Sequence, residues 1–591
     1  MSVKDVRGFP GVVFSSSLAE YAMVGSFMDF LRNAWEEKLP YAVATVNVQS
    51  GLAGLMAFAG AFLTDAYLGR FRMGLGLFTF SACVFRNRGP KASLFYTALV
   101  LISIGQGGYK PSLKALGSDQ IDGKEDPKVT KARTGAWWGT GTFFGMGVGL
   151  IVATFLNDEN DWMMAGSVST AVMVAALVVF LCRTPFYAIA KPCGSLLQRV
   201  VRVLIAAAMN RNVDHPTDAD QLYEKSQPST GDRLLPHTDS RPRTVDADPG
   251  SHSCPRIHLV CQPGRFSMVE PKSLYLSNVE VEVEVEVEVE VEVGLSLQSP
   301  KNASSGCQLC LDKAAIRVSS DAAEEGNINC RQCTVTQVEE TKILLGMFPI
   351  WTTCLMYGLV KAMGSTFFFE QAIGMDRKMG KIAVPLTSLL AFSSTSKILV
   401  SQFLVPLVEL STKLEHGIPP LMKIGTGMFF SIICCSCASV VENKRLKMIK
   451  KLSPASGVPM SVFWLLPQFF MLGAMDGLMS DGLKEFFEDN NHVPESMKNF
   501  GPSFFQSVIG MGSLLSAILI VVSTEVSKRG GKTCWICKNV SDADSHLDYF
   551  YRTFSVLSYV NLCVYMCISS IYCVKKEKAV NEEPENMEPV V

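Results

Sequence analysis

Long apolar segments separated by shorter polar ones dominate this chain. A helix needs about 20 mostly apolar residues to cross a bilayer. Eleven segments of this kind lie near residues 11–31, 43–66, 92–113, 136–156, 162–183, 342–368, 384–408, 420–441, 458–480, 503–524 and 550–573. A twelfth candidate, Leu68 to Phe85, has only about 13 apolar residues after Arg72, which is marginal for spanning. The pattern predicts an all-α membrane protein whose third helix is short.

The composition supports a membrane protein and argues against a nucleic-acid partner. Charged residues make up 18% of the chain, below the roughly 25% of soluble proteins. The net charge of −1 provides no basic field for nucleic acid. The first apolar run continues to Phe30 and contains Glu20 and Asp29, so we interpret it as a retained membrane helix rather than a cleaved signal.

Counting the short third helix, the spans divide into two groups of six around a long polar region. We therefore expect an N-terminal six-helix bundle at 1–183, a cytoplasmic linker at 184–340, a C-terminal six-helix bundle at 341–575 and a cytoplasmic tail at 576–591. The positive-inside rule gives the orientation. Basic residues gather on the side of the termini and the linker: Arg70, Arg72, Lys114, Lys124, Lys128, Lys131 and Arg133.

One basic loop disagrees with this orientation. Residues 86–91, Arg-Asn-Arg-Gly-Pro-Lys, follow the short third helix and would face outward. Either residues are missing from that helix, or the segment does not cross and everything downstream is inverted. We favour the missing residues.

The linker contains two unusual patterns. Val279 to Val293 is a strict Val–Glu alternation, which we interpret as low-complexity sequence. The pairs Cys307/Cys310 and Cys330/Cys333 have the spacing of a four-cysteine zinc site. Their flanks lack the Gly and aromatic residues usual in zinc ribbons, so we expect no metal site and no cofactor.

Ionisable residues inside the spans are the candidate functional groups, because a charge in the membrane costs several kcal/mol and often marks a transport path. Glu20, Asp29, Lys110, Lys361, Glu370, Lys397 and Asp476 are the candidates. Asp29 and Glu370 lie near predicted helix ends, where we expect them to reach water. Lys361 and Lys397 are open between paired structural charges and function. Lys110 and Asp476 are flanked by small residues that permit close helix approach, which favours function.

Several ordered motifs resemble a known family. Residues 65–71, Asp-Ala-Tyr-Leu-Gly-Arg-Phe, resemble the cytoplasmic loop signature of the major facilitator superfamily. Residues 105–111, Gly-Gln-Gly-Gly-Tyr-Lys-Pro, resemble the fourth-helix motif of the proton-dependent oligopeptide transporter family, with the plant nitrate/peptide branch the most similar. Further matches lie at 311–316, 333–340, 364–368, 375–377, 467–469, 494–498 and 546–551. The resemblance covers nearly the whole chain except about 240–310, which looks inserted.

This resemblance implies the major facilitator fold and alternating access to a site at the midplane. It assigns Lys110 to proton coupling or to contact with an anionic substrate group. It aligns Asp476 with a tenth-helix glutamate that contacts substrate, and it places Asp65, Gly69 and Arg70 in a cytoplasmic gate. The expected substrate and proton pathway consists of four residues within the membrane: Lys110, Asp476, Glu20 and Lys361. The implied partners are nitrate or a di- or tripeptide, protons and the lipid bilayer of the plasma or vacuolar membrane.

The first helix departs from the family pattern. The Glu-x-x-Glu-Arg proton motif is replaced by Ser17-Leu18-Ala19-Glu20-Tyr21, with a single acid and no following arginine. Tight proton symport is therefore not expected, and movement of an anion such as nitrate is favoured. The alternative is a transport-inactive sensor or scaffold, or a defective gene copy, which the short third helix also favours. No nucleophile–base set or phosphate loop supports an enzyme.

Overall fold

The computed structural model describes part of the chain in detail. The described residues are 9–23, 27–29, 31–32, 35–63, 92–119, 127–156, 162–182, 196–211, 310–316, 333–373, 375–379, 382–411, 418–451, 458–488, 495–529 and 546–581. The predicted third helix, the Val–Glu repeat and the gate residues Asp65, Gly69 and Arg70 lie outside them.

Helices make up most of the described residues. In the first half and the linker they are α1 (Phe9–Met23), α2 (Phe27–Asp29), α3 (Leu39–Leu63), α5 (Ala92–Asp119), α6 (Pro127–Leu156), α7 (Trp162–Cys182), α8 (Leu196–Met209) and the 3₁₀ turn η6 (Lys313–Ala315). In the second half they are α11 (Val335–Gly364), α12 (Phe367–Ile373), α13 (Thr387–Leu399), the π-helix η8 (Val400–Leu404), α14 (Val405–Ser411), α15 (Pro420–Lys451), the 3₁₀ turn η9 (Val462–Leu465), α16 (Leu466–Glu488), α17 (Glu495–Arg529) and α18 (Leu547–Asn581).

Four short strands lie at one end of the second half. They are β1 (Met375–Asp376), β2 (Lys378–Met379), β3 (Ile382–Ala383) and β4 (Val458–Ser461). β1 pairs with β4 in parallel, and β2 pairs with β3 in an antiparallel hairpin. β1 follows α12, and β4 precedes η9 and α16, so the strands connect the loops at the end that we predict to face outward.

The helices confirm a membrane architecture. Within the described residues, seven segments are long and apolar enough to cross a bilayer: Leu39–Phe62, Val335–Ile373, Thr387–Ser411, Pro420–Lys450, Val462–Phe487, Ser503–Val526 and Leu547–Cys573. Large apolar side chains such as Phe403, Leu407 and Leu410 are exposed on these segments, as expected of helices that face lipid tails. Within the expected first span, the structure describes α1, which ends at Met23, and the short α2.

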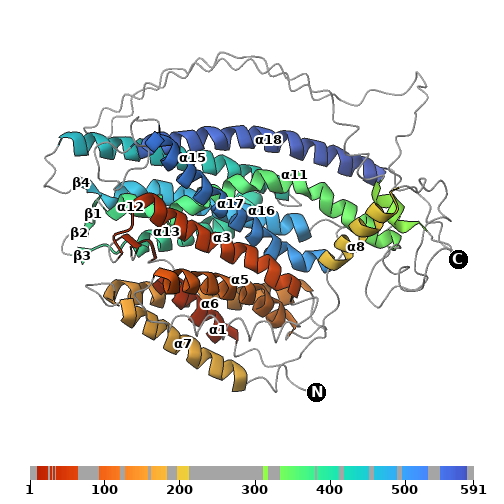
Figure 1. Ribbon diagram of the computed structural model, residues 1–591, viewed down its shortest axis with the longest axis horizontal. Coiled ribbons are helices and arrows are strands. Elements are labelled where there is room, and N and C mark those ends of the chain that lie inside the picture. Colours follow the sequence, from red (N-terminus) through yellow and green to blue (C-terminus); the bar gives the residue numbers. More distant parts are fainter. Residues whose placement is uncertain are drawn as a thin grey trace, which may run out of the picture.

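The helices run roughly along the long axis of the molecule, and α3 lies at the contact between the two halves (Figure 1). α1 packs against α6 and α7, whereas α3 packs against both α5 and α17 of the other half. Asn47 on α3 donates a hydrogen bond of 3.1 Å to Ser516 on α17, and both side chains are buried. α15 packs against α16 and α18 to complete the second half.

The linker contains structure that its sequence did not predict. α8 lies in the long polar region for which no helix was expected, and α11 begins at Val335, inside the expected linker. A capping box starts α11: the backbone N–H of Gln337 donates to the Thr334 hydroxyl, and the backbone N–H of Thr334 donates to the Gln337 side chain. α8 has only 14 residues, so a search for spans of about 20 residues passes over it.

Candidate functional site

Two of the predicted pathway residues meet in the first half. The Lys110 ammonium on α5 lies 2.7 Å from the Glu20 carboxylate on α1. These side chains are 37% and 39% exposed, so the pair is accessible to a solute or to water. Sequence reasoning identified both residues, and the structure brings them together as an ion pair.

The other predicted pathway residues meet in the second half. Asp476 on α16 lies 2.7 Å from the Lys361 ammonium on α11 and 3.1 Å from the Lys397 ammonium on α13. The Tyr357 hydroxyl donates a further hydrogen bond to Asp476. Each lysine side chain is 34% exposed and the aspartate 16%, so one carboxylate is shared by two lysines that partly face open space.

Lys397 and Tyr357 complete this group, and both are harder to predict from the sequence than Lys361 and Asp476. The sequence leaves Lys397 open between a structural and a functional charge, and it does not single out Tyr357. Tyr357 precedes Lys361 by four residues on α11, which places both on one face of the helix. The sequence therefore predicts that Tyr357 and Lys361 share a helix face. It does not predict which other helix this face contacts.

The charges of the two groups do not cancel. Three ammonium groups share two carboxylates, so the five side chains carry one net positive charge. Between helices, where the effective dielectric constant is lower than in water, such an excess attracts a small anion more strongly than it would at a protein surface. The arrangement can therefore bind one negative group without a further cation.

A hydrogen bond joins the two halves beside these charges. The Tyr21 and Ser394 hydroxyls lie 2.9 Å apart, linking α1 to α13. Tyr21 is the neighbour of Glu20, and Ser394 lies about one turn before Lys397. The charged groups of both halves therefore adjoin one interface.

Glycines allow the close helix contacts that the flanking small residues predicted. A Cβ at Gly107 would lie 2.2 Å from the Ala53 carbonyl oxygen on α3, and one at Gly473 would lie 2.3 Å from the Ser393 carbonyl oxygen on α13. Any side chain at either position would push the helices apart. Both glycines are three residues before a charged residue of the site, so they fix where Lys110 and Asp476 lie.

A separate ion pair joins the halves at the end that we predict to face outward. Arg32 lies 2.9 Å from Glu370, and the two side chains are 13% and 6% exposed. The Tyr41 hydroxyl on α3 donates a hydrogen bond of 3.3 Å to Glu525 on α17. The expectation that Glu370 reaches water near a helix end is wrong. The chain continues beyond α11 into α12, which keeps Glu370 inside the protein.

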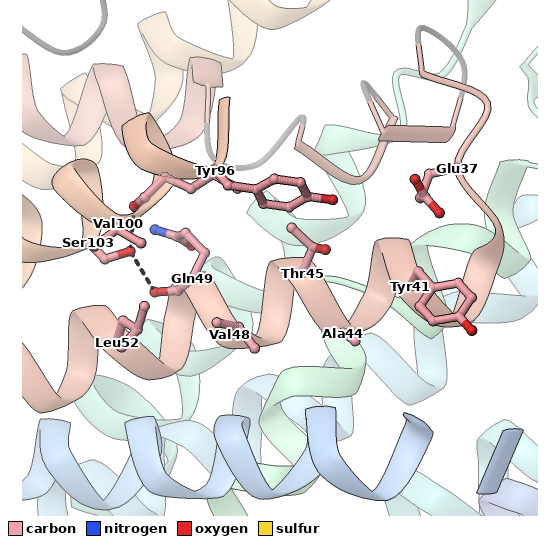
Figure 2. Close-up of a pocket in the computed structure, with 11 residues that line it drawn as sticks. Glu37, Tyr41, Ala44, Thr45, Val48, Gln49, Leu52, Tyr96, Val100 and Ser103 are labelled. Carbon is pink, nitrogen blue, oxygen red and sulfur yellow. Dashed lines mark hydrogen bonds between the residues drawn. The ribbon is translucent and has the colours of Figure 1, made fainter. Parts of the chain in front are cut away.

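A cavity of about 370 Å³ lies between α3 and α5 (Figure 2). Its polar lining includes Thr45, Gln49 and Tyr96, and the Ser103 hydroxyl donates a hydrogen bond of 3.1 Å to the Gln49 carbonyl oxygen. Glu37 is its charged lining residue. None of the five site charges lines it, so we do not assign it to the pathway.

The described cysteines of the zinc-like pattern differ from each other in environment. Cys310 is exposed, whereas Cys333 is buried and packs with Leu311 and Val338. Burial raises the pKa of the Cys333 thiol to about 11, which disfavours the thiolate that zinc requires. Cys307 and Cys330 lie outside the described residues.

Comparison with known proteins identifies the family. The POT family pattern matches residues 68–242 and 295–536. The Arabidopsis thaliana protein NRT1/PTR family 5.6 is 31% identical over 587 residues, covering 94% of this chain and 89% of that protein.

Solved structures of low sequence identity share the fold. The in meso crystal structure of the POT family transporter PepTSo superposes with a TM-score of 0.61 at 15% identity, covering 97% of this chain and 99% of that one. A POT family transporter in complex with 5-aminolevulinic acid gives a TM-score of 0.57 at 10% identity, with 96% and 99% covered. These matches show that the chain shares the fold of the two solved proteins, and the sequence matches show that it belongs to the POT family of membrane transporters.

Proposed function

We propose that this protein carries a small solute with an anionic group across a plasma or vacuolar membrane, with nitrate as the first candidate and a short peptide, bound through its carboxylate, as the second. The single observation that supports this most is the sharing of Asp476 by Lys361 and Lys397. One carboxylate neutralises only part of the positive charge of the two lysines. A monoanion that approaches either lysine can therefore pair with the remaining positive charge.

The groups of the two halves have different roles in this proposal. Lys110, paired with Glu20, holds a second positive charge that a carboxylate or nitrate oxygen can contact. Asp476 keeps the two lysines of the second half from repelling each other when no solute is bound, and it can contact the amine of a peptide. A relative that binds 5-aminolevulinic acid agrees with a small substrate that carries an acidic group.

The ion pair between Arg32 and Glu370 supports alternating access. It joins the halves at the end predicted to face outward, so it has to break for solute to enter from that side. Rocking of the two bundles about the central charges would expose the site to one side at a time. On the cytoplasmic side we expect Asp65, Gly69 and Arg70 to form the gate; they lie outside the described residues.

We propose that transport is not tightly coupled to protons. Residues 17–21 supply one acid, Glu20, and that acid is paired with Lys110. Without the second acid and the arginine of the family motif, the proton-coupling cluster of the first helix is incomplete in this chain. Uptake should accordingly change little between acidic and neutral external pH.

Uptake measurements test the proposal. The protein is produced in an expression host, and uptake of nitrate and of a dipeptide is measured at acidic and neutral external pH. Flux of at least one solute with weak pH dependence is the expected result. No flux of either, in a protein that reaches the membrane, would contradict the proposal.

The Lys110→Ala variant tests the named site. It removes the cation but leaves Glu20 charged, so a substrate anion meets net negative charge in the first half. We expect loss of nitrate uptake with unchanged surface expression. Equal uptake by the variant would exclude Lys110 from the pathway.

The alternative is a transport-inactive membrane protein or a defective gene copy. The marginal third helix and the missing first-helix motif are the observations that favour it. Sequencing the mature transcript separates the two hypotheses. A message that lacks the segment near 240–310 and restores the third helix would assign the inserted segment and the short third helix to the gene sequence.

A further inference from the structure

The linker helix α8 has an apolar face that packs into the protein. Val200, Val203, Ala206 and Ala207 are buried on it. Val203, Ala206 and Ala207 join one cluster with residues of the 311–315 segment and the start of α11. This face therefore attaches the linker to the second half.

The opposite face of α8 is apolar too, and it is exposed. Val201, Leu204, Ile205 and Met209 are 46%, 43%, 48% and 41% exposed. Residues at spacings of three and four lie on one side of a helix, so these four side chains form one stripe, which we call the outer α8 face.

Polar contacts prevent α8 from turning this face inward. Arg199 lies 3.4 Å from Glu340 at the start of α11, and the Asn210 side chain donates a hydrogen bond of 2.9 Å to the Lys313 carbonyl oxygen. The 310–316 segment is itself held by the ion pair between Asp312 and Lys342, at 2.6 Å and nearly buried. The outer α8 face is therefore presented in a fixed orientation.

An apolar face left in water is unfavourable, and such faces mark contact with another apolar surface, so we expect the outer α8 face to be covered. The position of the helix indicates which. α8 follows the last membrane helix of the first half and lies beside the start of α11, at the ends of the long helices (Figure 1). By the positive-inside orientation, this is the cytoplasmic boundary of the bilayer.

We propose that α8 is an interfacial helix whose outer face, Val201, Leu204, Ile205 and Met209, lies in the cytoplasmic leaflet of the membrane. Arg202, exposed beside this stripe, is placed to reach lipid head groups, as basic residues flanking interfacial helices do. The linker is then held at two surfaces, by protein on one side of α8 and by lipid on the other. This inference does not depend on which solute the protein carries.

Depth-dependent quenching tests the inference on the full chain in lipid vesicles. An environment-sensitive fluorescent amino acid replaces Ile205 in one variant and Arg202 in a matched control. Quenching by acyl-chain nitroxide lipids and by aqueous iodide is then measured. We expect lipid quenching at position 205 to exceed that at position 202 by about threefold, with the reverse order for iodide.

Two outcomes would overturn the inference. Strong iodide quenching and no lipid quenching at position 205 would place the face in water. Protection from both quenchers would show that another part of the protein covers it. If the probe at 205 prevents folding, the same measurement at position 204 replaces it, because Leu204 lies on the same face.

Discussion

The central charges and the outer ion pair are both made of lysine or arginine with acids, yet they differ in burial and in what they join. Glu20, Lys110, Lys361 and Lys397 are about one-third exposed and Asp476 is 16% exposed, and each ion pair lies within one half. Arg32 and Glu370 are 13% and 6% exposed, and their pair crosses from one half to the other.

This difference separates two uses of charge. A partly exposed charge can exchange its ion-pair partner for a solute. It still contacts water, so the exchange costs little free energy. A nearly buried pair cannot be opened without exposing or stranding two charges, so it suits a contact that is wholly made or wholly broken. We therefore assign solute binding to the central charges and closure to the outer pair.

The largest effect is expected from Asp476→Asn. The substitution leaves Lys361 and Lys397 without their shared carboxylate, so two like charges face each other and bind an anion too tightly to release it. We expect nitrate uptake to fall by more than about tenfold, with a lower apparent KM. Initial uptake rates over a range of nitrate concentrations measure both quantities.

Asp476→Glu is the matched control for charge. It keeps the carboxylate and lengthens the side chain by one methylene, so it should retain most of the uptake. Equal loss of uptake in both variants would mean that the length of the side chain, rather than its charge, determines uptake. The assignment of solute binding to the central charges would then be wrong.

A smaller effect is expected from breaking the outer pair. Arg32→Gln removes the cation from a nearly buried contact, which destabilises the outward-closed state and leaves Glu370 without this partner. We expect uptake to fall by about fivefold with KM little changed, because the solute site is intact. Uptake kinetics measure the fall in rate and the KM. The alkylation rate of a cysteine placed at the outer end measures how often that end is open.

The exchanged pair, Arg32→Glu with Glu370→Arg, is the informative control. If the pair acts as a closure, the exchange should recover part of the uptake that either single change loses. Additive losses would show that the two residues act separately.

The contrast between the regions also explains what the sequence could predict. Charges within long apolar segments are conspicuous, so Lys110, Asp476, Glu20 and Lys361 could be selected without a structure. Their pairing could not be selected, because it depends on how five helices face one another. For Lys397 the sequence leaves a structural and a functional role equally open, and the contact with Asp476 decides between them.

The outer pair and α8 were missed for other physical reasons. Glu370 is nine residues beyond Lys361, near the expected helix end, and only the fold of α12 shows that it turns inward. Arg32 follows the first predicted span and carries no periodic signal in the sequence. α8 is too short for a search based on membrane thickness, although its two apolar faces are visible once the helix is known.

The smallest effect, and the sharpest test of closure, is expected from Gly510→Ala. At the contact between α3 and α17, a Cβ at Gly510 would lie 2.6 Å from the Gly51 carbonyl oxygen and 2.9 Å from the Gly54 Cα. One methyl group should therefore separate the halves slightly while leaving every charge in place. We expect uptake to fall about twofold to threefold and the outer-end cysteine to react faster.

Gly147→Ala is the matched control, because nothing lies within 4 Å of a Cβ at Gly147 on α6, and it should leave uptake and cysteine reactivity unchanged. If Gly510→Ala lowers uptake without changing cysteine reactivity, the contact between α3 and α17 does not take part in closure. Arg32 and Glu370 would then close the outer end without it. If both quantities change together, closure extends over the packed surface of the two halves, and the ion pair is one contact within it.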